Sequence, residues 1–403
     1  MQGCATGGSL DNARNQFFSG QPQAALATLD SNSISSRNRL LGHLDRGLIA
    51  HTAGEYQKSV DAFKAAYKLL NDNDFISVRE QSASLVSNDW ATTYKGEYSE
   101  RLWIHTFQMM NFLLLNNTQA AAVEARQALK VYAEHGAALQ NDWYTRTLIA
   151  MSFEAAGKGD SAHIEYKKLL DNIGSDAGMA RRAWQNAVRL GREQDAKKFK
   201  SLVSSSGKAG QNGELVLFVQ TGAIPQKIAG EIFIDPELYA SFPTYPDIPR
   251  PDVQLTVSKN GAPQSADIVK TQLVDISRSA LAARGKQIGT KQILRIAAKK
   301  ELGRALEKRA DGYGGLITAA FFLLEQADTR SWATLPAHVS LVQIPLSEGR
   351  HSVQLNIRDG SRVYDVDVQN IDIAANRPTF RSIRVGAGAP KVTTPQIPAT
   401  ASP

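Results

Sequence analysis

The chain has 403 residues, of which 42% are hydrophobic and 21% charged, a balance typical of a globular protein with two or three domains. A single cysteine excludes an intramolecular disulfide and a zinc site built from several cysteines. No apolar run approaches the roughly 18 residues that span a bilayer, and the net charge of +7 is concentrated in one segment.

The only cysteine, Cys4, follows Met1-Gln2-Gly3 and resembles the end of a bacterial lipobox, in which a cysteine after a Leu-x-Gly or Leu-x-Ala stretch is acylated. Met1 stands where leucine is usual, and the charged and apolar regions of a signal peptide are missing. We therefore expect residues 1–8 to be a lipobox remnant and tether, with Cys4 as the lipidation site. The alternative is that Cys4 is incidental.

Residues 9–203 carry a pattern typical of tetratricopeptide helix pairs, in which small and aromatic residues at fixed offsets let each pair stack on the next. In the clearest copy, Gly54 opens the turn, Tyr56 wedges two helices apart, and Phe63 and Ala66 face the partner helix. The same offsets recur at four further turns: Gly20, Asn116, Gly157 and Gly191. Any two amphipathic helices joined by a glycine would share some of this pattern, but five aligned turns predict an α-solenoid.

The periodicity changes after residues 204–213, whose serine- and glycine-rich composition predicts a linker. Leu215 to Val219 is a continuous apolar run that fits a fully buried strand. Alternating segments with turns at Asn260-Gly261 and Asp359-Gly360 predict hairpins.

These strands predict that residues 214–385 form an α/β domain with a sandwich-like β-sheet, and the Pro- and Thr-rich residues 386–403 are expected to be disordered. The predicted fold class is thus α+β multidomain, with an N-terminal TPR-like α-solenoid followed by this α/β domain.

Helical sequence interrupts the strands from about residue 275 to 326. Residues 278–309 contain ten basic side chains against two acidic ones, so the basicity of the protein belongs to one predicted helix. A solvated helix face is one interpretation. The other is that its cations meet an acidic partner, anionic lipid or an anionic envelope polymer. The candidate anion-facing residues are Arg295, Lys299, Arg304 and Lys308.

The densest polar constellation precedes and enters a predicted helix that begins near Tyr98. Its members are Asn88, Asp89, Tyr94, Glu97, Glu100, Arg101 and His105. Arg101 and His105 share one helix face by their i, i+4 spacing, and Glu97 lies within reach of Arg101. One interpretation is a buried ion-pair network that holds two repeats in register, and another is a polar floor that binds a partner. Acid–base catalysis is the least favoured, because no nucleophile, metal or cofactor motif accompanies these residues.

Several strings carry a family resemblance over residues 40 to about 357. They are Asn88-Asp89 with Tyr94-x-Gly96-Glu97-x-x-Glu100-Arg101, Val123-Glu124-x-Arg126, Gly213-Glu214-Leu215, Gly222-x-x-Pro225-x-Lys227, Asp328-x-Arg330-x-Trp332-x-x-Leu335-Pro336 and Gly349-x-His351-x-Val353. With these strings the chain resembles an uncharacterised family of proteobacterial tetratricopeptide-repeat-like lipoproteins. The resemblance implies a lipid anchor at Cys4 and an envelope location, and Ala5 after the cysteine implies the outer membrane.

The sequence therefore predicts a non-catalytic, periplasm-facing outer-membrane lipoprotein that binds protein partners through the solenoid groove and supports cell-envelope assembly. We expect no cofactor, no metal and no nucleic-acid partner, since no matching motif is present. The competing hypothesis is a polyanion- or glycan-binding module, or an enzyme, with its site in the C-terminal domain.

Overall fold

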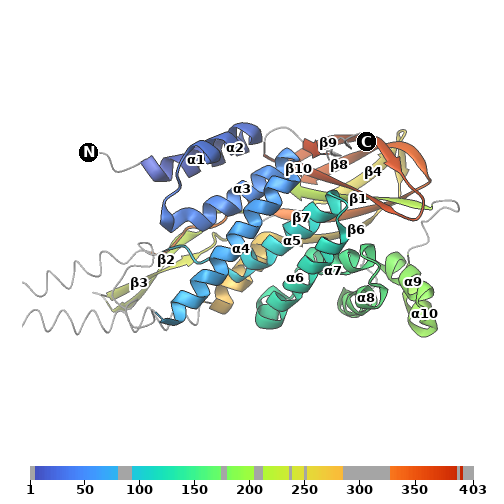
Figure 1. Cartoon of the computed structure of the whole chain (residues 1–403), viewed down its shortest axis with the longest axis horizontal. Helices are drawn as coiled ribbons and strands as arrows, with labels where there is room; N and C mark the ends of the chain where they lie inside the picture. Colours follow the sequence, from blue (N-terminus) through green and yellow to red (C-terminus); the bar gives the residue numbers. More distant parts are fainter. Residues whose placement is uncertain are drawn as a thin grey trace, which may run out of the picture.

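The structure is a computed structural model that describes residues 5–79, 93–173, 179–203, 212–235, 238–248, 252–284, 327–387 and 391–393. Helices form an array in the first half of the chain, and strands form two packed sheets in the second half (Figure 1). The described part is therefore a helical TPR-like region followed by a sheet-rich region.

The helices come in consecutive antiparallel pairs. The pairs are α1 (Ala5–Phe18) with α2 (Pro22–Ser31), α3 (Arg39–Ala53) with α4 (Tyr56–Arg79), α5 (Tyr98–Leu114) with α6 (Thr118–Leu139), α7 (Trp143–Ala155) with α8 (Gly159–Ile173), and α9 (Ala180–Arg189) with α10 (Glu193–Leu202). A short 3-10 helix, η1 (Ser36–Asn38), leads into α3.

All five predicted turn residues have a left-handed backbone, with φ of 80° at Gly20, 82° at Gly54, 56° at Asn116, 73° at Gly157 and 66° at Gly191. In each turn the N–H of this residue donates to the carbonyl three residues earlier. The next N–H donates to the carbonyl five residues before itself. This is the Schellman arrangement, which glycine and asparagine accept most easily. The predicted turns of the repeat pattern are confirmed.

Helix contacts within a pair follow the predicted offsets. Phe63 and Ala66 of α4 are fully buried, and a Cβ added at Gly47 of α3 would lie 2.4 Å from the Phe63 ring. Only glycine lets the two helices approach this closely, because an interior packed to crystal density has no spare volume. Tyr56 is buried as well, as expected for a wedge at the start of α4.

The strands form two packed sheets and a separate hairpin. The five-stranded sheet has the order β11 (Lys391–Thr393), β10 (Pro378–Val385), β1 (Gly213–Thr221), β7 (His338–Leu346) and β6 (Asp267–Gln272). The four-stranded sheet has the order β5 (Ala262–Gln264), β4 (Gln254–Lys259), β8 (Gly349–Asp359) and β9 (Arg362–Ile373). β2 (Ile228–Asp235) pairs only with β3 (Leu238–Thr244) in the described part. Both predicted hairpin turns are confirmed, with positive φ at Asn260, Gly261 and Gly360.

Strand β1 is buried on both faces because each face meets a different layer. Leu215, Leu217 and Val219 point into the core between the two sheets, where they meet the aliphatic side chains of β8 and β9. Val216 and Phe218 point the other way, into the core that the helices form. Successive side chains of a strand alternate in direction, so a strand between two layers has a continuous apolar sequence. The predicted buried strand and the sandwich-like packing are confirmed.

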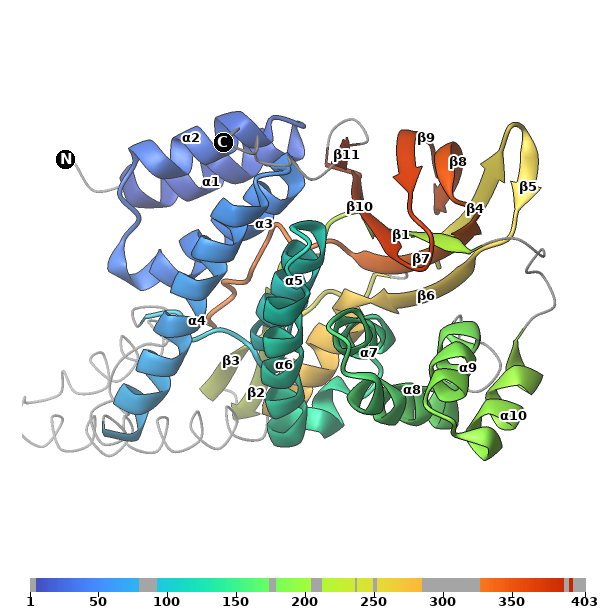
Figure 2. The same ribbon diagram turned by 45° about the vertical axis from the view of Figure 1, so that its right-hand side comes forward.

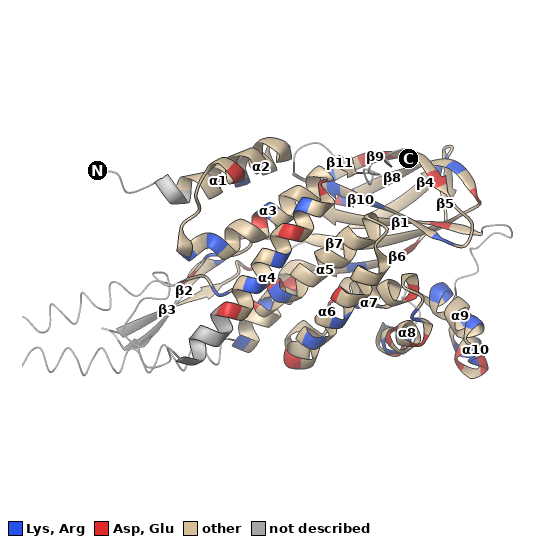
Figure 3. Cartoon of the chain, in the orientation of Figure 1, with Lys and Arg blue, Asp and Glu red and all other residues tan. Residues whose placement is uncertain are grey.

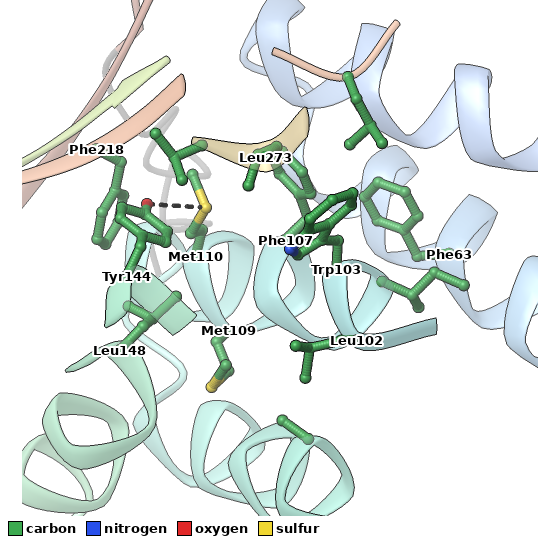
Figure 4. Close-up of a cluster of buried hydrophobic side chains, with 14 of the residues drawn as sticks. Phe63, Leu102, Trp103, Phe107, Met109, Met110, Tyr144, Leu148, Phe218 and Leu273 are labelled. Atoms are coloured by element: carbon green, nitrogen blue, oxygen red, sulfur yellow. Dashed lines mark hydrogen bonds between the residues drawn. The ribbon is translucent and has the colours of Figure 1, made fainter. Parts of the chain in front are cut away.

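The sheet packs against the first helices of three pairs. Helices α3 and α5 contact β10, and α7 contacts β6 and β7 (Figure 2). In the shared core, Phe218 of β1 lies beside Tyr144 of α7, while Phe107 and Met110 of α5 complete the layer (Figure 4). One hydrophobic cluster thus runs from the helix pairs to the sheet, and the inner helices of the array are covered by the chain's own strands.

Two boundary predictions are wrong for the residues that the structure describes. Within the tail expected to be disordered, Lys391–Thr393 form β11 on β10, because Val392 packs against the sandwich core and Thr393 accepts a 2.7 Å hydrogen bond from the Tyr56 hydroxyl. Within the expected tether 1–8, residues from Ala5 onward belong to α1.

Other predictions fall partly or wholly beyond these ranges. Residues 273–284 are helical, as expected, but Arg295, Lys299, Arg304 and Lys308 lie outside the described residues. Cys4 and most of the predicted linker also lie outside them.

Candidate functional site

The predicted polar constellation is centred on the start of α5. We call Tyr94, Glu97, Glu100, Lys227 and Arg284 the α5 cluster. Glu97 is the N-cap residue, and its side chain accepts the backbone N–H of Glu100, while the Glu100 carboxylate accepts the backbone N–H of Glu97 at 3.0 Å. This reciprocal capping box satisfies two amide groups that the helix itself leaves unbonded. The capping box, which depends only on the spacing of Glu97 and Glu100, therefore holds both carboxylates at the start of α5.

Glu97 is paired with two cations that come from distant parts of the chain. Lys227 Nζ donates to its Oε1 at 2.8 Å, and Arg284 Nη1 donates to its Oε2 at 3.0 Å. Burial alone would raise the pKa of Glu97, but the charges of Lys227 and Arg284 hold that pKa below its ordinary value. The Lys227 side chain is only 1% exposed, so this is a fully buried ion pair.

Glu100 has a different environment. Its Oε2 accepts the Tyr94 hydroxyl at 2.6 Å, and its Oε1 accepts the backbone N–H of Trp332 at 2.9 Å. Burial raises the pKa of Glu100, and the negative charge of Glu97 adds to this effect against the opposing charge of Lys227. The pKa of Tyr94 is also raised, first by burial and then by the Glu100 charge. The two carboxyl groups of the cluster therefore have pKa values shifted in opposite directions.

The α5 cluster connects segments that are far apart in the sequence. Lys227 precedes β2, Arg284 ends the described part of the helix over 273–284, and Trp332 precedes β7. Sequence reasoning missed these three as partners of Glu97 and Glu100, although Lys227 and Trp332 occur in the strings that carry the family resemblance. Every member except Arg284 is buried, and all are bonded within the chain. The partners of Glu97 and Glu100 come from the sheet-rich half of the chain, so these contacts do not join two repeats as the ion-pair interpretation expected.

The remaining predicted residues lie further along α5 or outside the described part. His105 Nδ1 lies 2.7 Å from Glu124 Oε2 of α6, and the Tyr67 ring meets the His105 ring edge-on. Arg101 is partly buried on α5, one turn from His105 as predicted. Asn88 and Asp89 lie outside the described residues. The use of any of these residues by a partner stays a prediction.

A second polar network, which sequence reasoning missed, lies between the helices and the sheet. His51 of α3 is fully buried, with Nδ1 2.6 Å from Asn111 Oδ1 and Nε2 2.9 Å from Ser382 Oγ of β10. Asn111 Nδ2 donates to Ser59 Oγ at 2.8 Å, which in turn donates to a backbone carbonyl. Asn111 therefore offers its oxygen to His51, so Nδ1 carries the proton and Nε2 accepts from Ser382.

The hydrogen bonds link serine to histidine and histidine to asparagine, the same sequence that links a nucleophile, a base and an orienting amide in some enzymes. Burial lowers the pKa of His51 to about 4, against the smaller opposing effect of its bond to Asn111. Ser382 is 3% exposed and His51 0%, so no substrate reaches the serine in this structure. The network instead bonds α3 and α5 to β10.

An open groove lies where the end of the helix array meets the sheet. It has a volume of about 790 Å³, and α9 forms one side while the first residues of β1 and β10 form the other. We call it the α9 groove and define it by Trp184, Val188, Arg189, Glu214, Pro345 and Arg377. Basic residues are prominent on α9 in this region (Figure 3). No sequence motif marked it, since its walls come from separate segments of the chain, namely α7, α9 and the ends of β1, β7 and β10.

Charged side chains fix the floor of the α9 groove. Arg182 donates to Glu154 at 3.2 Å and to Glu214 at 2.5 Å, and Tyr166 donates to Glu154 at 2.6 Å. Burial raises the pKa of Glu214. Burial also acts to raise the pKa of Glu154, but the charge of Arg182 together with the bonds from Tyr166 and Arg189 lowers that pKa below its ordinary value. These bonds hold α9 against α7 and β1.

No group of three His, Cys, Asp or Glu residues in the described part is placed to hold a metal ion. No described helix combines the length and apolar character needed to cross a membrane.

Comparison with protein-family models and with curated proteins found no match. Solved structures of repeat proteins match about half of the chain. MamA from Desulfovibrio magneticus RS-1 is 14% identical with a TM-score of 0.35, covering 50% of this chain and 93% of that one. A putative kinesin light chain from Podospora anserina with TPR-like repeats is 13% identical with a TM-score of 0.35, covering 48% and 91%. The Rap conjugation regulator of plasmid pLS20, solved with the Phr* peptide, is 12% identical with a TM-score of 0.30, covering 50% and 55%.

Proposed function

We propose that this protein is a non-catalytic interaction scaffold of the bacterial envelope, anchored in the outer membrane by a lipid on Cys4 and facing the periplasm. The observation that carries the scaffold proposal is the array of five helix pairs with one shared turn geometry. Stacked repeats present extended surfaces that bind peptides and protein segments.

The docking of the sheet determines which surfaces remain for a partner. The inner helices α3, α5 and α7 are covered by β6, β7 and β10, so a partner meets the outer helices or the α9 groove. The internal sheet also makes the array rigid, because the two layers share one core. A rigid array with an open groove suits an adaptor that holds another envelope protein in place.

The lipid anchor is supported by the sequence around Cys4 and by the position of α1. Cys4 directly precedes Ala5, the first residue of α1, so a lipid on this cysteine would hold the helix array close to the membrane surface. Two acyl chains bind a membrane stably, whereas one binds only marginally. The N-terminal end of the array would then face the membrane and the α9 groove would lie at the opposite end of the array.

The anchor is tested by expressing the full-length precursor with an alkyne fatty acid, with Cys4→Ser as the matched control. We expect label in the natural protein, recovery in the outer-membrane fraction, and loss of both in Cys4→Ser. Equal labelling of the two proteins would refute the anchor.

The scaffold role is tested by site-specific photocrosslinking in intact cells. A photoreactive residue at Val188 of α9 is compared with one at Val363 of β9, which is similarly exposed. We expect one discrete protein adduct from position 188 and none from position 363. Identical adduct patterns from both positions would count against a specific partner.

A further inference from the structure

The α9 groove combines an apolar strip with an excess of positive charge. Trp184 and Val188 are four residues apart on α9 and thus share one face of the helix, and Val188 is 56% exposed. Exposed apolar residues grouped inside a charged rim are typical of protein-binding sites. The strip offers an anchor point for one or two apolar side chains.

The charge of the groove is not balanced within the chain. Arg181, Arg182, Arg189 and Arg377 line the groove, whereas its acidic lining residues are Glu154 and Glu214. Arg181 is paired with Asp267, which lies outside the lining. Glu154 and Glu214 are both bonded to Arg182, and Glu154 also accepts from Arg189 at 3.1 Å. Arg377 is exposed and has no ion-pair partner among the described residues. An acidic group entering the groove would therefore meet an available guanidinium.

The rim that carries Arg377 is fixed in place. The backbone N–H of Asn376 donates to Asn212 O at 2.7 Å, and Asn212 Oδ1 accepts the N–H of Glu348 at 3.1 Å. Asn376 has a positive φ of 57°, which defines the turn between β9 and β10. The backbone of the turn is thus already ordered, so only the Arg377 side chain must be ordered when a ligand binds.

The same walls indicate how a ligand is recognised. Pro345, near the end of β7, and Pro378, the first residue of β10, both line the groove. Proline has no backbone N–H, so neither residue can donate a hydrogen bond to an added strand. Recognition therefore falls on side chains. The ammonium of Lys200 lies 5.7 Å from the centroid of the Trp184 ring, and the ring also packs against the core. The Trp184 ring is therefore only partly exposed, which suits contact with one apolar side chain of a peptide better than stacking on a whole sugar ring.

We propose that the α9 groove binds an acidic peptide segment of a partner protein, with an apolar side chain on Trp184 and Val188 and a carboxylate on Arg377. This inference rests on the proposed scaffold role and specifies the site and the chemistry of its partner. A partner held on the outer helices would leave the scaffold role intact and exclude only this site.

The test measures binding of short fluorescein-labelled peptides to the whole protein by fluorescence anisotropy. The probes are a peptide of aspartate, leucine and serine, and a sister peptide with lysine in place of aspartate. Arg377→Glu and Val188→Glu alter the groove, and Arg362→Glu makes the same charge change at an exposed position of β9. All three positions are exposed, so the variants should fold, which circular dichroism checks.

We expect the acidic peptide alone to bind, with about tenfold weaker affinity for Arg377→Glu and for Val188→Glu and an unchanged affinity for Arg362→Glu. Added salt should weaken binding to the natural protein more than binding to Arg377→Glu, because the lost contact is electrostatic. Equal binding of both peptides, equal affinity of all variants, or binding of polygalacturonate without the acidic peptide would overturn the proposal. Photocrosslinking from position 188 remains an independent test of the scaffold role.

Discussion

Breaking the buried ion pair between Glu97 and Lys227 should destabilise the protein strongly, and removing both charges should restore much of the loss. Glu97→Gln keeps the side-chain shape and an oxygen for the helix cap but removes the charge. Lys227, only 1% exposed, then loses the carboxylate bonded to it and keeps only the weaker attraction of Glu100, while Arg284 is 27% exposed and can turn to water. Removing one partner of a buried ion pair typically costs about 3–5 kcal/mol, so we expect a loss of about 3 kcal/mol in the free energy of unfolding.

The partner substitution should cost less, because the two changes are not symmetric. In Lys227→Met the carboxylate of Glu97 keeps its 3.0 Å bond to Arg284, so a counter-ion remains. In the double variant the pair carries no charge, and Glu100 keeps its hydrogen bonds from Tyr94 and Trp332. We therefore expect the order of stability to be natural protein, Lys227→Met, double variant and Glu97→Gln, with a coupling energy of about 1–3 kcal/mol.

Urea unfolding at pH 7 measures these differences, followed by tryptophan fluorescence and by far-UV circular dichroism. Trp103 and Trp332 are buried in the core beside the cluster, and coincident transitions from both probes would justify a single free energy. Glu55→Gln is the control, since it breaks an ion pair with Lys58 at the surface and should leave the midpoint unchanged. A double variant that is less stable than Glu97→Gln would refute the reasoning.

Two further predictions concern the shared core. His51, whose pKa burial lowers to about 4, should stay neutral in the folded protein at pH 5.5, and its ring signals should not titrate by NMR between pH 5 and 8. Because the unfolded state protonates near pH 6.5, the native state should lose about 3 kcal/mol between pH 6.5 and 4, a slope that His51→Gln should reduce. A His51 signal that titrates near pH 6.5 would contradict this. Gly47→Ala should destabilise the protein by about 1–3 kcal/mol in urea, because the new Cβ meets the Phe63 ring. Gly136→Ala, which meets nothing within 4 Å, should be neutral or stabilising, and equal effects would contradict the close packing of α3 on α4.

The sequence was most informative where structure depends on near neighbours. The five helix turns and both hairpin turns could be predicted because a left-handed backbone selects glycine or asparagine at one position. The burial of β1 could be predicted from its continuous apolar run, since covering both faces of a strand requires apolar residues on both.

The contacts that define the candidate sites could not be predicted in the same way. His51 bonds to Ser382, and Glu97 bonds to Lys227, across long stretches of sequence. These contacts depend on how the sheet docks on the helices, and periodicity within a segment contains no information about that docking. The α9 groove was missed for the same reason, because its walls meet only after α9, β1 and β10 have assembled.

The parallel pairing of β1 with β10 has a consequence for how the protein folds. β1 is the central strand of its sheet, yet one of its two neighbours is β10, which lies near the end of the described fold. Strand 213–221 lacks one of its two neighbours, and the faces of α3 and α5 that contact β10 stay uncovered, until residues 378–385 have joined the sheet. Pairing over such sequence separation is slow, and exposed strands aggregate easily. We therefore expect this chain to depend on chaperones until β10 has joined the sheet, and truncation before β10 to yield an insoluble product rather than a folded helical half.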